Sequence, residues 1–217
     1  MASFYPLGLR LDGKLCVVVG GGRVGERKVL GLVEHGAQVR LVSPKISETL
    51  RKLALEGQLE WRARKASVQD LEGATLVFLA SSDAEAHAEL ERAAHERGML
   101  VNRADAPEEC DFIVPASFRS GNIEVAVFSS GEAPFFARWL RCRLEMELSR
   151  NLSTMGELMA ELRAEIKELP VAQERRAELL NSVLESDVLD ILRDAGKEAA
   201  MQRARTLVAS LLKDSQG

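Results

Sequence analysis

The stretch "LCVVVGGGRVGERKVLGL", residues 15–32, decides the fold of this chain. The apolar run at 14–20 is typical of a strand buried on both faces, and residues 25–36 have the apolar spacing of a helix. Between them, Gly20, Gly22 and Gly25 form a GxGxxG pattern. These glycines permit a tight turn, a close approach of the backbone to a pyrophosphate, and close packing of the helix on the strand. The stretch predicts a dinucleotide-binding turn; a tight turn without a ligand is the alternative reading.

The turn also predicts which residues contact the cofactor: Gly20, Gly21, Gly22, Arg23, Val24 and Gly25. One part of the usual pattern is missing, because the second strand ends in "LVSPK" and carries no acidic residue for the ribose hydroxyls. Ser43, beside Pro44, could bond the ribose instead, and Lys45 or Arg40 could meet a 2′-phosphate. We therefore expect NAD as the cofactor, with the choice against NADP less certain than the presence of a dinucleotide.

The chain continues with alternating strands and helices as far as Asp105. This alternation is typical of βαβ units around a parallel sheet with helices on both faces. The pattern then changes, since two β-rich runs joined by a short turn predict a hairpin, and the remainder is helical. We expect strands at 14–20, 37–43, 59–65, 74–81 and 99–105, helices at 25–36, 47–57 and 83–98, hairpin strands at 112–118 and 122–129, and helices from 134 onward. The Met and Leu stripe after residue 151 is expected to be core.

Composition excludes several classes of protein. The chain has 217 residues, a net charge of −4 and 46% hydrophobic residues, which gives no argument for nucleic acid or an anionic membrane as a partner. No run approaches the roughly 18 apolar residues of a membrane-spanning helix, and the first residues lack the pattern of a signal peptide. Three widely spaced cysteines form no disulfide framework. These features predict a cytoplasmic protein.

Four segments together resemble one enzyme family: "YPLGLRLDGKLCVVVGGGRVGERKVLGL", "LEGATLVFLASSDAE", "GMLVNRADAPEECDFIVPA" and "VAVFSSGEAPFFARWLR". Their order and spacing are similar to those of precorrin-2 dehydrogenases, which include the N-terminal module of siroheme synthases and stand-alone relatives. The resemblance covers about residues 4–145. It implies an NAD-dependent oxidoreductase that converts precorrin-2 to sirohydrochlorin in siroheme biosynthesis, and some members also insert Fe²⁺ as a ferrochelatase (a lyase).

The resemblance also implies an architecture. A Rossmann-type parallel-sheet domain (an α/β fold) would cover residues 1–111. A small β-rich dimerisation region, made of a hairpin and a helix, would cover 112–150, and an α-helical C-terminal domain would cover 151–217. The expected assembly is a homodimer, and the expected partners are the tetrapyrrole precorrin-2 and, in chelatase members, Fe²⁺, with no nucleic acid and no membrane.

Asp105 is the catalytic candidate, because it ends a strand where ligands bind in open α/β sheets and matches the acidic residue of the family motif. It could take up the proton released in the oxidation, or only cap the turn before Pro107. Asn102, in the same motif, could bond cofactor or substrate, or close a turn. Ser81 and Ser82 match a segment that lies against the dinucleotide in the family; they could also cap the next helix.

The substrate-binding candidates lie further along the chain. A segment "SSGEAP", one residue shorter than the family's usual segment, could bind a substrate carboxylate or only begin a helix. Arginines near the motifs could grip the carboxylates of the tetrapyrrole, although a solvated helix face is the plainer reading for each of them. The candidates are Ser129, Ser130, Gly131, Arg119 and Arg138, with Arg103 and Arg141 as further arginines. No metal site is expected, and His87 and His95 are expected to be ordinary surface or half-buried helix residues.

A second class of function uses the same glycine turn without catalysis. A dinucleotide-sensing regulatory module would need no catalytic acid at a strand end, and Asp105 speaks against it. A dehydrogenase for another small substrate is a third reading. The sequence alone favours the dehydrogenase of precorrin-2 through the resemblance.

Overall fold

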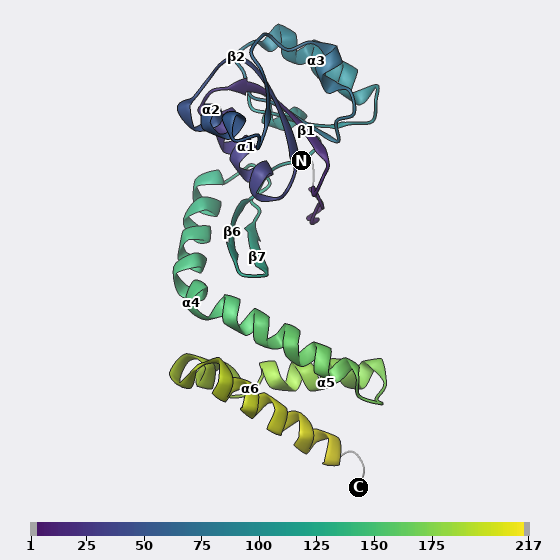
Figure 1. The fold of residues 1–217 in the computed structure, drawn as a ribbon, viewed down its shortest axis with the longest axis vertical. Coiled ribbons are helices and arrows are strands. Elements are labelled where there is room, and N and C mark those ends of the chain that lie inside the picture. The colour runs from purple at the N-terminus through teal and green to yellow at the C-terminus, as the bar shows by residue number, and fades with distance from the viewer. Residues whose placement is uncertain (1–3, 215–217) are drawn as a thin grey trace. The chain divides into compact units, whose positions relative to one another are not determined.

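The computed structural model describes residues 4–214, and the chain divides into two compact units, Met1–Val114 and Pro115–Gly217. Figure 1 shows a sheet with helices in the first unit, and a hairpin with long helices in the second. The division at 114/115 places the glycine turn and Asp105 in the first unit, and the hairpin and the helices from residue 134 onward in the second.

The first unit is built on a five-stranded parallel sheet with the order β3-β2-β1-β4-β5. Its strands are β1 (Leu15–Gly21), β2 (Gln38–Ile46), β3 (Glu60–Arg62), β4 (Leu76–Leu79) and β5 (Leu100–Arg103). Three helices connect them: α1 (Arg23–Glu34), α2 (Glu48–Leu55) and α3 (Ala84–His95), with short 3-10 turns at Val68–Leu71 and Pro107–Glu109. The strand order reverses between β1 and β4, which is the arrangement of a dinucleotide-binding α/β fold. The predicted Rossmann-type fold is confirmed.

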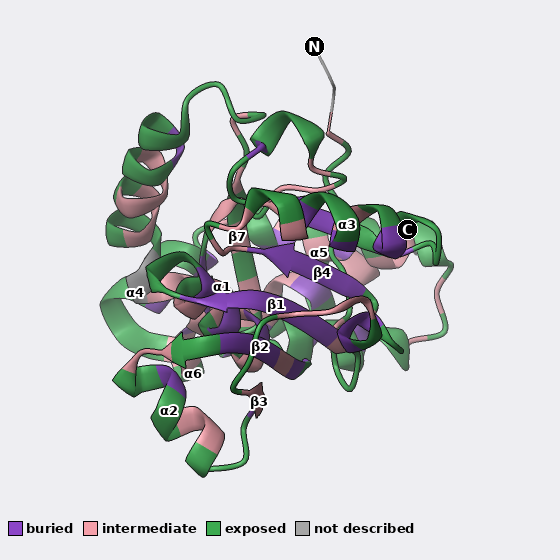
Figure 2. Cartoon of the chain, turned by 90° about the horizontal axis from the view of Figure 1, so that it is seen from above, coloured by how far each residue is buried: buried purple, intermediate pink, exposed green. Residues whose placement is uncertain are grey.

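The apolar side chains of β1 are buried on both faces of this sheet, as its continuous apolar sequence predicts. Cys16 and Val18 pack in a core that contains residues of α1 and α2, whereas Val17 and Val19 pack in a second core with Leu90 of α3. Figure 2 shows β1 and β4 almost wholly buried. Helices therefore cover both faces, and the ends of β1 and β4 are left as the place where a ligand can meet the sheet.

Several strand boundaries differ from those expected, and β4 and β5 are both shorter. β2 continues to Ile46 and includes Ser43 and Pro44, because the register shifts after Val19 and pairs Gly21 with Ile46. β3 is shorter than the expected 59–65 and keeps only three residues, Glu60–Arg62. Helix α2 begins as predicted, since the Ser47 side chain accepts a hydrogen bond from the Leu50 N–H at 3.3 Å.

The second unit begins with an antiparallel hairpin, β6 (Ala116–Ser120) and β7 (Ile123–Val127). β6 begins at Ala116 instead of at the expected residue 112, and β7 is shorter than expected. Helix α4 (Pro134–Lys167) packs against both strands and continues without interruption through residue 150. Together with α5 (Gln173–Leu184) and α6 (Val188–Asp214), it encloses an apolar core that includes Leu158, Leu162, Leu179 and Val183. The predicted hairpin and helices are present, and the predicted three-part division at 111/112 and 150/151 stays a proposal.

Candidate active site

The glycine turn between β1 and α1 is shaped by two close backbone contacts. Gly20 has φ +109°, and a Cβ there would lie 2.7 Å from the carbonyl group of Ala80 and the nitrogen of Ser81. A Cβ on Gly25 would lie 1.9 Å from the carbonyl oxygen of Gly20. Both positions exclude any larger residue, so α1 starts close against the ends of β1 and β4.

Gly22 and the start of α1 fit an anionic group of a dinucleotide. A Cβ on Gly22 would meet nothing within 4 Å, so this glycine borders open space rather than packed atoms. Gly22 is the N-cap of α1, and no side chain caps the helix. Uncapped N–H groups and the positive end of the helix dipole favour a phosphate. Of the other turn residues, Arg23 and Val24 are exposed, and Gly21 packs against Ile46.

At the end of β2, the Ser43 side chain bonds to the backbone of the same strand. Ser43 is buried, and its hydroxyl donates to the carbonyl of Lys45 at 2.7 Å. Pro44 and Lys45 are exposed. Arg40 lies within β2 and binds the Glu60 carboxylate at 2.8 Å as well as the Asp70 carbonyl at 2.9 Å. The contact of Ser43 and Pro44 with the cofactor stays a prediction.

Ser81 and Ser82 follow β4, directly beside the glycine turn. Ser81 is half-buried, and its Oγ lies 2.7 Å from Nε2 of His87. Ser82 is exposed. The cap of α3 is Asp83 rather than either serine, since the Asp83 carboxylate accepts from the Ala86 N–H at 3.3 Å. Ser81 is therefore positioned by a histidine and not by a helix end.

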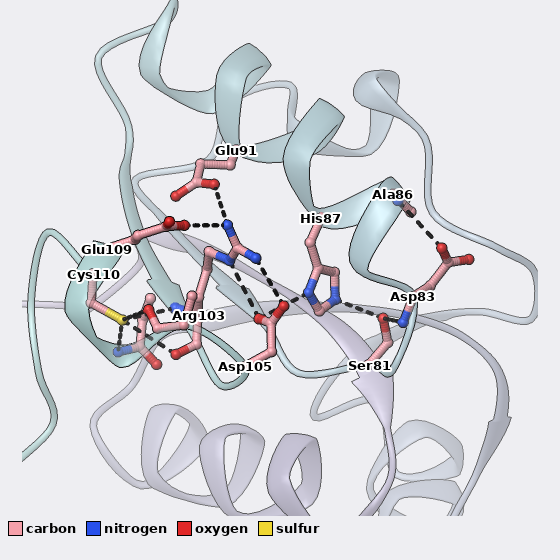
Figure 3. Close-up of polar contacts among 11 residues, drawn as sticks. Ser81, Asp83, Ala86, His87, Glu91, Arg103, Asp105, Glu109 and Cys110 are labelled. Carbon is pink, nitrogen blue, oxygen red and sulfur yellow. Dashed lines mark hydrogen bonds and ion pairs between the residues drawn. The ribbon is translucent and has the colours of Figure 1, made fainter.

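Asp105 follows β5, and its side chain is 32% exposed. Its carboxylate accepts from Arg103 Nη2 at 2.8 Å and Nε at 3.3 Å, and it lies 3.1 Å from His87 Nδ1 (Figure 3). Hydrogen bonds from Arg103 outweigh the opposing effect of burial and, with a smaller contribution from His87, lower the pKa of Asp105 to about 2. Asp105 is therefore a carboxylate at neutral pH.

His87 was missed as a functional residue. The expectation of a surface or half-buried side chain was wrong, because His87 is fully buried between Ser81 and Asp105. The sequence held a signal for its burial: His87 precedes Leu90 by three residues and Ala94 by seven, which places it on the apolar face of α3. Its two polar partners come from the β4 and β5 ends and could not be read from that spacing.

Arg103 and Asn102 hold the segment that carries Asp105. Arg103, a candidate for binding substrate carboxylates, is only 12% exposed and also binds Glu91 at 2.8 Å and Glu109 at 2.6 Å. Asn102 is buried and donates to the Phe112 carbonyl at 2.9 Å. These contacts hold the backbone after β5 and give both residues a positioning task within the first unit.

The remaining substrate-binding candidates belong to the second unit. Arg119 pairs with Glu124 across the hairpin at 2.9 Å, and Arg138 is an exposed residue of α4. Between β7 and α4, Ser129 is half-buried, and the exposed Ser130 and Gly131 have positive φ angles of +50° and +83°. Arg141 pairs with Glu145 in α4 at 2.5 Å. Their contact with substrate stays a prediction.

Among the residues that the structure describes, no group of three or more His, Cys, Asp or Glu side chains could hold a metal ion. Within the same residues, no helix is both long and apolar enough to cross a membrane. The three cysteines are all unpaired. In the first unit, a glycine turn and an uncapped helix start follow β1. Ser81 and Asp105 follow the carboxyl ends of β4 and β5, and His87 bonds to both of them.

Comparison with known proteins agrees with this arrangement. A family model described as putative NAD(P)-binding matches residues 7–116, which include the whole glycine turn and Asp105. The solved structure titled "SirC, precorrin-2 dehydrogenase" has a TM-score of 0.78 and 23% identity, and the match covers 94% of this chain and all of that one. This likeness confirms the fold. The family description agrees with the predicted cofactor, NAD.

Curated siroheme synthases are similar over most of this chain. The siroheme synthase of Methylobacillus flagellatus is 36% identical over 201 residues, which are 91% of this chain and 43% of that protein. The siroheme synthase of Pseudomonas paraeruginosa is 40% identical over 175 residues, or 80% of this chain and 38% of that protein. The chain spans less than half the length of these relatives. Because the family model matches residues 7–116, which are half of the chain, the chain belongs to the putative NAD(P)-binding family. Its resemblance to precorrin-2 dehydrogenases and siroheme-synthase modules led us to expect this family.

Proposed function

We propose that this protein is a dehydrogenase that oxidises precorrin-2 to sirohydrochlorin with NAD⁺ in siroheme biosynthesis. The observation that carries the proposal is the position of Ser81 beside a glycine turn that fits a dinucleotide, with Asp105 linked to Ser81 through His87. The similarity to siroheme synthases and to a structure titled as a precorrin-2 dehydrogenase supports the substrate. When bound, the dinucleotide supplies the hydride acceptor.

In this proposal the chain's own residues bind and orient the reactants. The N-terminus of α1 holds the pyrophosphate, and Gly22 leaves room for it. Asp105 is the catalytic carboxylate, since it is ionised and partly exposed at the end of β5. A negative charge there assists the departure of a proton from the substrate as the hydride leaves. A regulatory module without catalysis would need no such group.

Oxidation of precorrin-2 under anaerobic conditions with NAD⁺ tests the activity. We expect the purified protein to form sirohydrochlorin, and we expect Asp105→Ala to fold normally yet lose about 100-fold or more of kcat. Circular dichroism and urea unfolding would check that the variant is folded. Full activity of Asp105→Ala would refute the role given to this carboxylate.

Binding of the cofactor is tested separately by glycine substitutions. Gly22→Ala places a methyl group in the open space at the start of α1, so we expect about tenfold weaker NAD binding with little loss of stability. Gly31→Ala is the matched control, because a Cβ at this position of α1 also meets nothing within 4 Å and lies away from the turn. Calorimetry with NAD⁺ measures both; equal affinities in the two variants would contradict the assigned site.

Insertion of Fe²⁺ belongs to the same proposal as a second activity of the family, with the metal ion as a substrate. Anaerobic incubation with sirohydrochlorin and Fe²⁺ or Co²⁺ tests it, followed by the absorbance of the metallated product. Asp105 would take part through its negative charge, which favours the departure of protons from the macrocycle. Absence of product with wild-type protein that still oxidises precorrin-2 would restrict the protein to the dehydrogenase step.

A homodimer is the proposed assembly, and a cytoplasmic location is proposed from the cysteine pattern. Exposed aromatic side chains at the start of α4 support the dimer: Phe135 is 82% exposed and Trp139 56%. Phe136 stacks on Trp139 with ring centroids 5.6 Å apart. Large exposed apolar surfaces favour association. We expect light scattering to give the mass of a dimer, and Trp139→Arg to shift it toward a monomer; a monomeric wild-type protein would contradict the proposal.

A further inference from the structure

Ser81, His87 and Asp105 form a continuous hydrogen-bonded chain in the first unit (Figure 3). Ser81 Oγ lies 2.7 Å from His87 Nε2, and His87 Nδ1 lies 3.1 Å from Asp105 Oδ1. The imidazole ring is fully buried, whereas Ser81 and Asp105 are both partly exposed at its two ends. Both ring nitrogens are therefore occupied by side chains that reach the surface of the site.

The positions of the protons follow from the charge of Asp105. Hydrogen bonds from Arg103 lower the pKa of Asp105 to about 2, so at neutral pH its carboxylate only accepts hydrogen bonds. Nδ1 of His87 must therefore carry the hydrogen that it shares with Asp105. In the neutral ring Nε2 is then an acceptor, and the Ser81 hydroxyl donates to it. The Ser81 oxygen also accepts from the Asp83 N–H at 3.4 Å, which orients the hydroxyl.

Asp105 itself is poorly suited to keep a proton. Its two oxygens accept three hydrogen bonds, two from Arg103 and one from His87. Protonation of either oxygen would remove the negative charge that pairs with Arg103. The guanidinium of Arg103 is held in place by Glu91 and Glu109. An imidazole accepts a proton more readily near neutral pH, and a carboxylate beside it stabilises the imidazolium.

We propose that His87 is a positioning residue that acts through Ser81: it receives, at Nε2, the proton released when the substrate is oxidised. The proposal rests on the proposed dehydrogenase function and names the group that holds the proton. The location of Ser81 supports it, because a Cβ on Gly20 of the cofactor turn would lie 2.7 Å from the Ser81 nitrogen. The proposed proton acceptor thus lies next to the turn that would hold the dinucleotide.

The substrate loses a hydride, with its electron pair, to the oxidised dinucleotide. A neighbouring bond to hydrogen breaks, its electron pair forms the new double bond, and its proton passes to Ser81 Oγ while the Ser81 hydroxyl proton moves to His87 Nε2. The imidazolium is stabilised by Asp105 and returns the proton to solvent through Ser81 after the product leaves. No further oxidant is needed.

Other charged groups around His87 come from three segments. Asp83, between β4 and α3, interacts with His87 and pairs with Lys65 at 3.1 Å. Arg103 of β5 binds Asp105, which in turn contacts His87. Glu91 of α3 binds Arg103. The carboxylates of Asp83 and Asp105 favour the imidazolium, and Arg103 opposes it.

Nuclear magnetic resonance of the cofactor-free protein tests the arrangement without any activity. The chain has three histidines, so ¹⁵N-histidine spectra can be assigned with His35→Gln, His87→Gln and His95→Gln. We expect the His87 hydrogen to lie on Nδ1, and Ser81→Ala to move the Nε2 resonance. A hydrogen on Nε2 in the wild-type protein would overturn the proposal.

Kinetics then tests the transfer of the proton through Ser81 to His87, which we call the relay. We expect Ser81→Ala and His87→Gln to lower kcat for precorrin-2 about 100-fold with less than a threefold change in KM. The acidic limb of the wild-type kcat profile should have the same midpoint as the titration of His87 seen by magnetic resonance, and His87→Gln should lack that limb. His95→Gln is the matched control on the same helix, since His95 is exposed and pairs with Asp111 at 2.9 Å; it should keep the wild-type profile.

The outcomes separate this proposal from the proposed function. Active wild-type protein with variants of Ser81 and His87 that keep kcat within threefold would overturn the relay and leave the dehydrogenase intact. Loss of kcat together with an unchanged acidic limb in His87→Gln would overturn it too, because a merely structural role predicts that pattern. Wild-type protein that does not oxidise precorrin-2 refutes the proposed function, whereas the magnetic resonance result still decides the hydrogen-bonded arrangement.

Discussion

Two aspartates of the first unit, Asp70 and Asp105, both bind arginine, yet they serve different purposes. Asp70 lies in the turn after β3, is fully buried, and accepts from Arg62, Arg64 and Ser67 at 2.6 to 3.1 Å. Asp105 is partly exposed and shares a hydrogen bond with a histidine. A carboxylate whose oxygens are saturated and shielded supports the fold, whereas one that keeps an open side and a titratable neighbour is suited to chemistry.

Both carboxylates have lowered pKa values, so the pKa alone does not separate them. Burial raises the pKa of Asp70, but hydrogen bonds from Arg64, Arg62 and Ser67 outweigh it and hold the pKa well below the usual value. The pKa of Asp105 is also lowered, to about 2, chiefly by hydrogen bonds from Arg103. The two carboxylates differ in their exposure to solvent and in the residues that they bind. Substitutions can measure what this difference does to stability and activity.

The largest effect on stability is expected for Asp70→Asn. The variant leaves two partly exposed arginines facing an amide at a fully buried position, which should lower the free energy of unfolding by about 3 kcal/mol. Urea unfolding measures the change. Glu72→Gln, at an exposed carboxylate two residues away, is the control and should change stability by less than about 0.5 kcal/mol. Equal effects of the two variants would show that Asp70 is not the structural carboxylate.

The pH dependence of stability should also identify Asp70 as a structural carboxylate. Because the pKa of Asp70 is lower in the folded than in the unfolded chain, its contribution is complete above the unfolded value of 3.8 and is lost as pH falls through the folded pKa. We expect wild-type stability to fall more steeply between pH 5 and pH 2 than that of Asp70→Asn, by about 2 kcal/mol. Chemical unfolding at several pH values measures this; parallel curves for the two proteins would contradict it.

A smaller change in stability than that of Asp70→Asn is expected for Asp105→Asn. Arg103 would keep Glu91 and Glu109, and the amide oxygen could still accept from His87, so unfolding should change by less than about 1 kcal/mol. Activity in the same variant should fall, since the amide carries no charge to stabilise an imidazolium. A loss of stability as large as that of Asp70→Asn would place Asp105 among the structural residues.

The sheet and the cofactor turn could be predicted because their signals are local. The apolar run of β1, the glycines of the turn and the cap at Ser47 each specify backbone within a few residues. The order of the strands and several of their boundaries required the structure, because they depend on pairing between distant segments.

The site could be predicted only in part, because its key contacts join distant segments. Asp105 was identified from its place at a strand end, but its bond to His87 spans 18 residues and needs the packing of α3 beside β5. The bonding of Ser43 to Lys45 was likewise hidden, since it depends on β2 continuing past Pro44. Contacts formed by tertiary packing leave no fixed spacing in a sequence.

The strand order of the first unit has a consequence for how copies of this chain can associate. The two outer strands of the sheet, β3 and β5, have only three and four residues, whereas the inner strands β1 and β2 have seven and nine. Such short edges offer few unpaired backbone groups, so another chain gains little by adding a strand to this sheet. The short outer strands thus leave side-chain surfaces, such as the aromatic start of α4, for the proposed dimer.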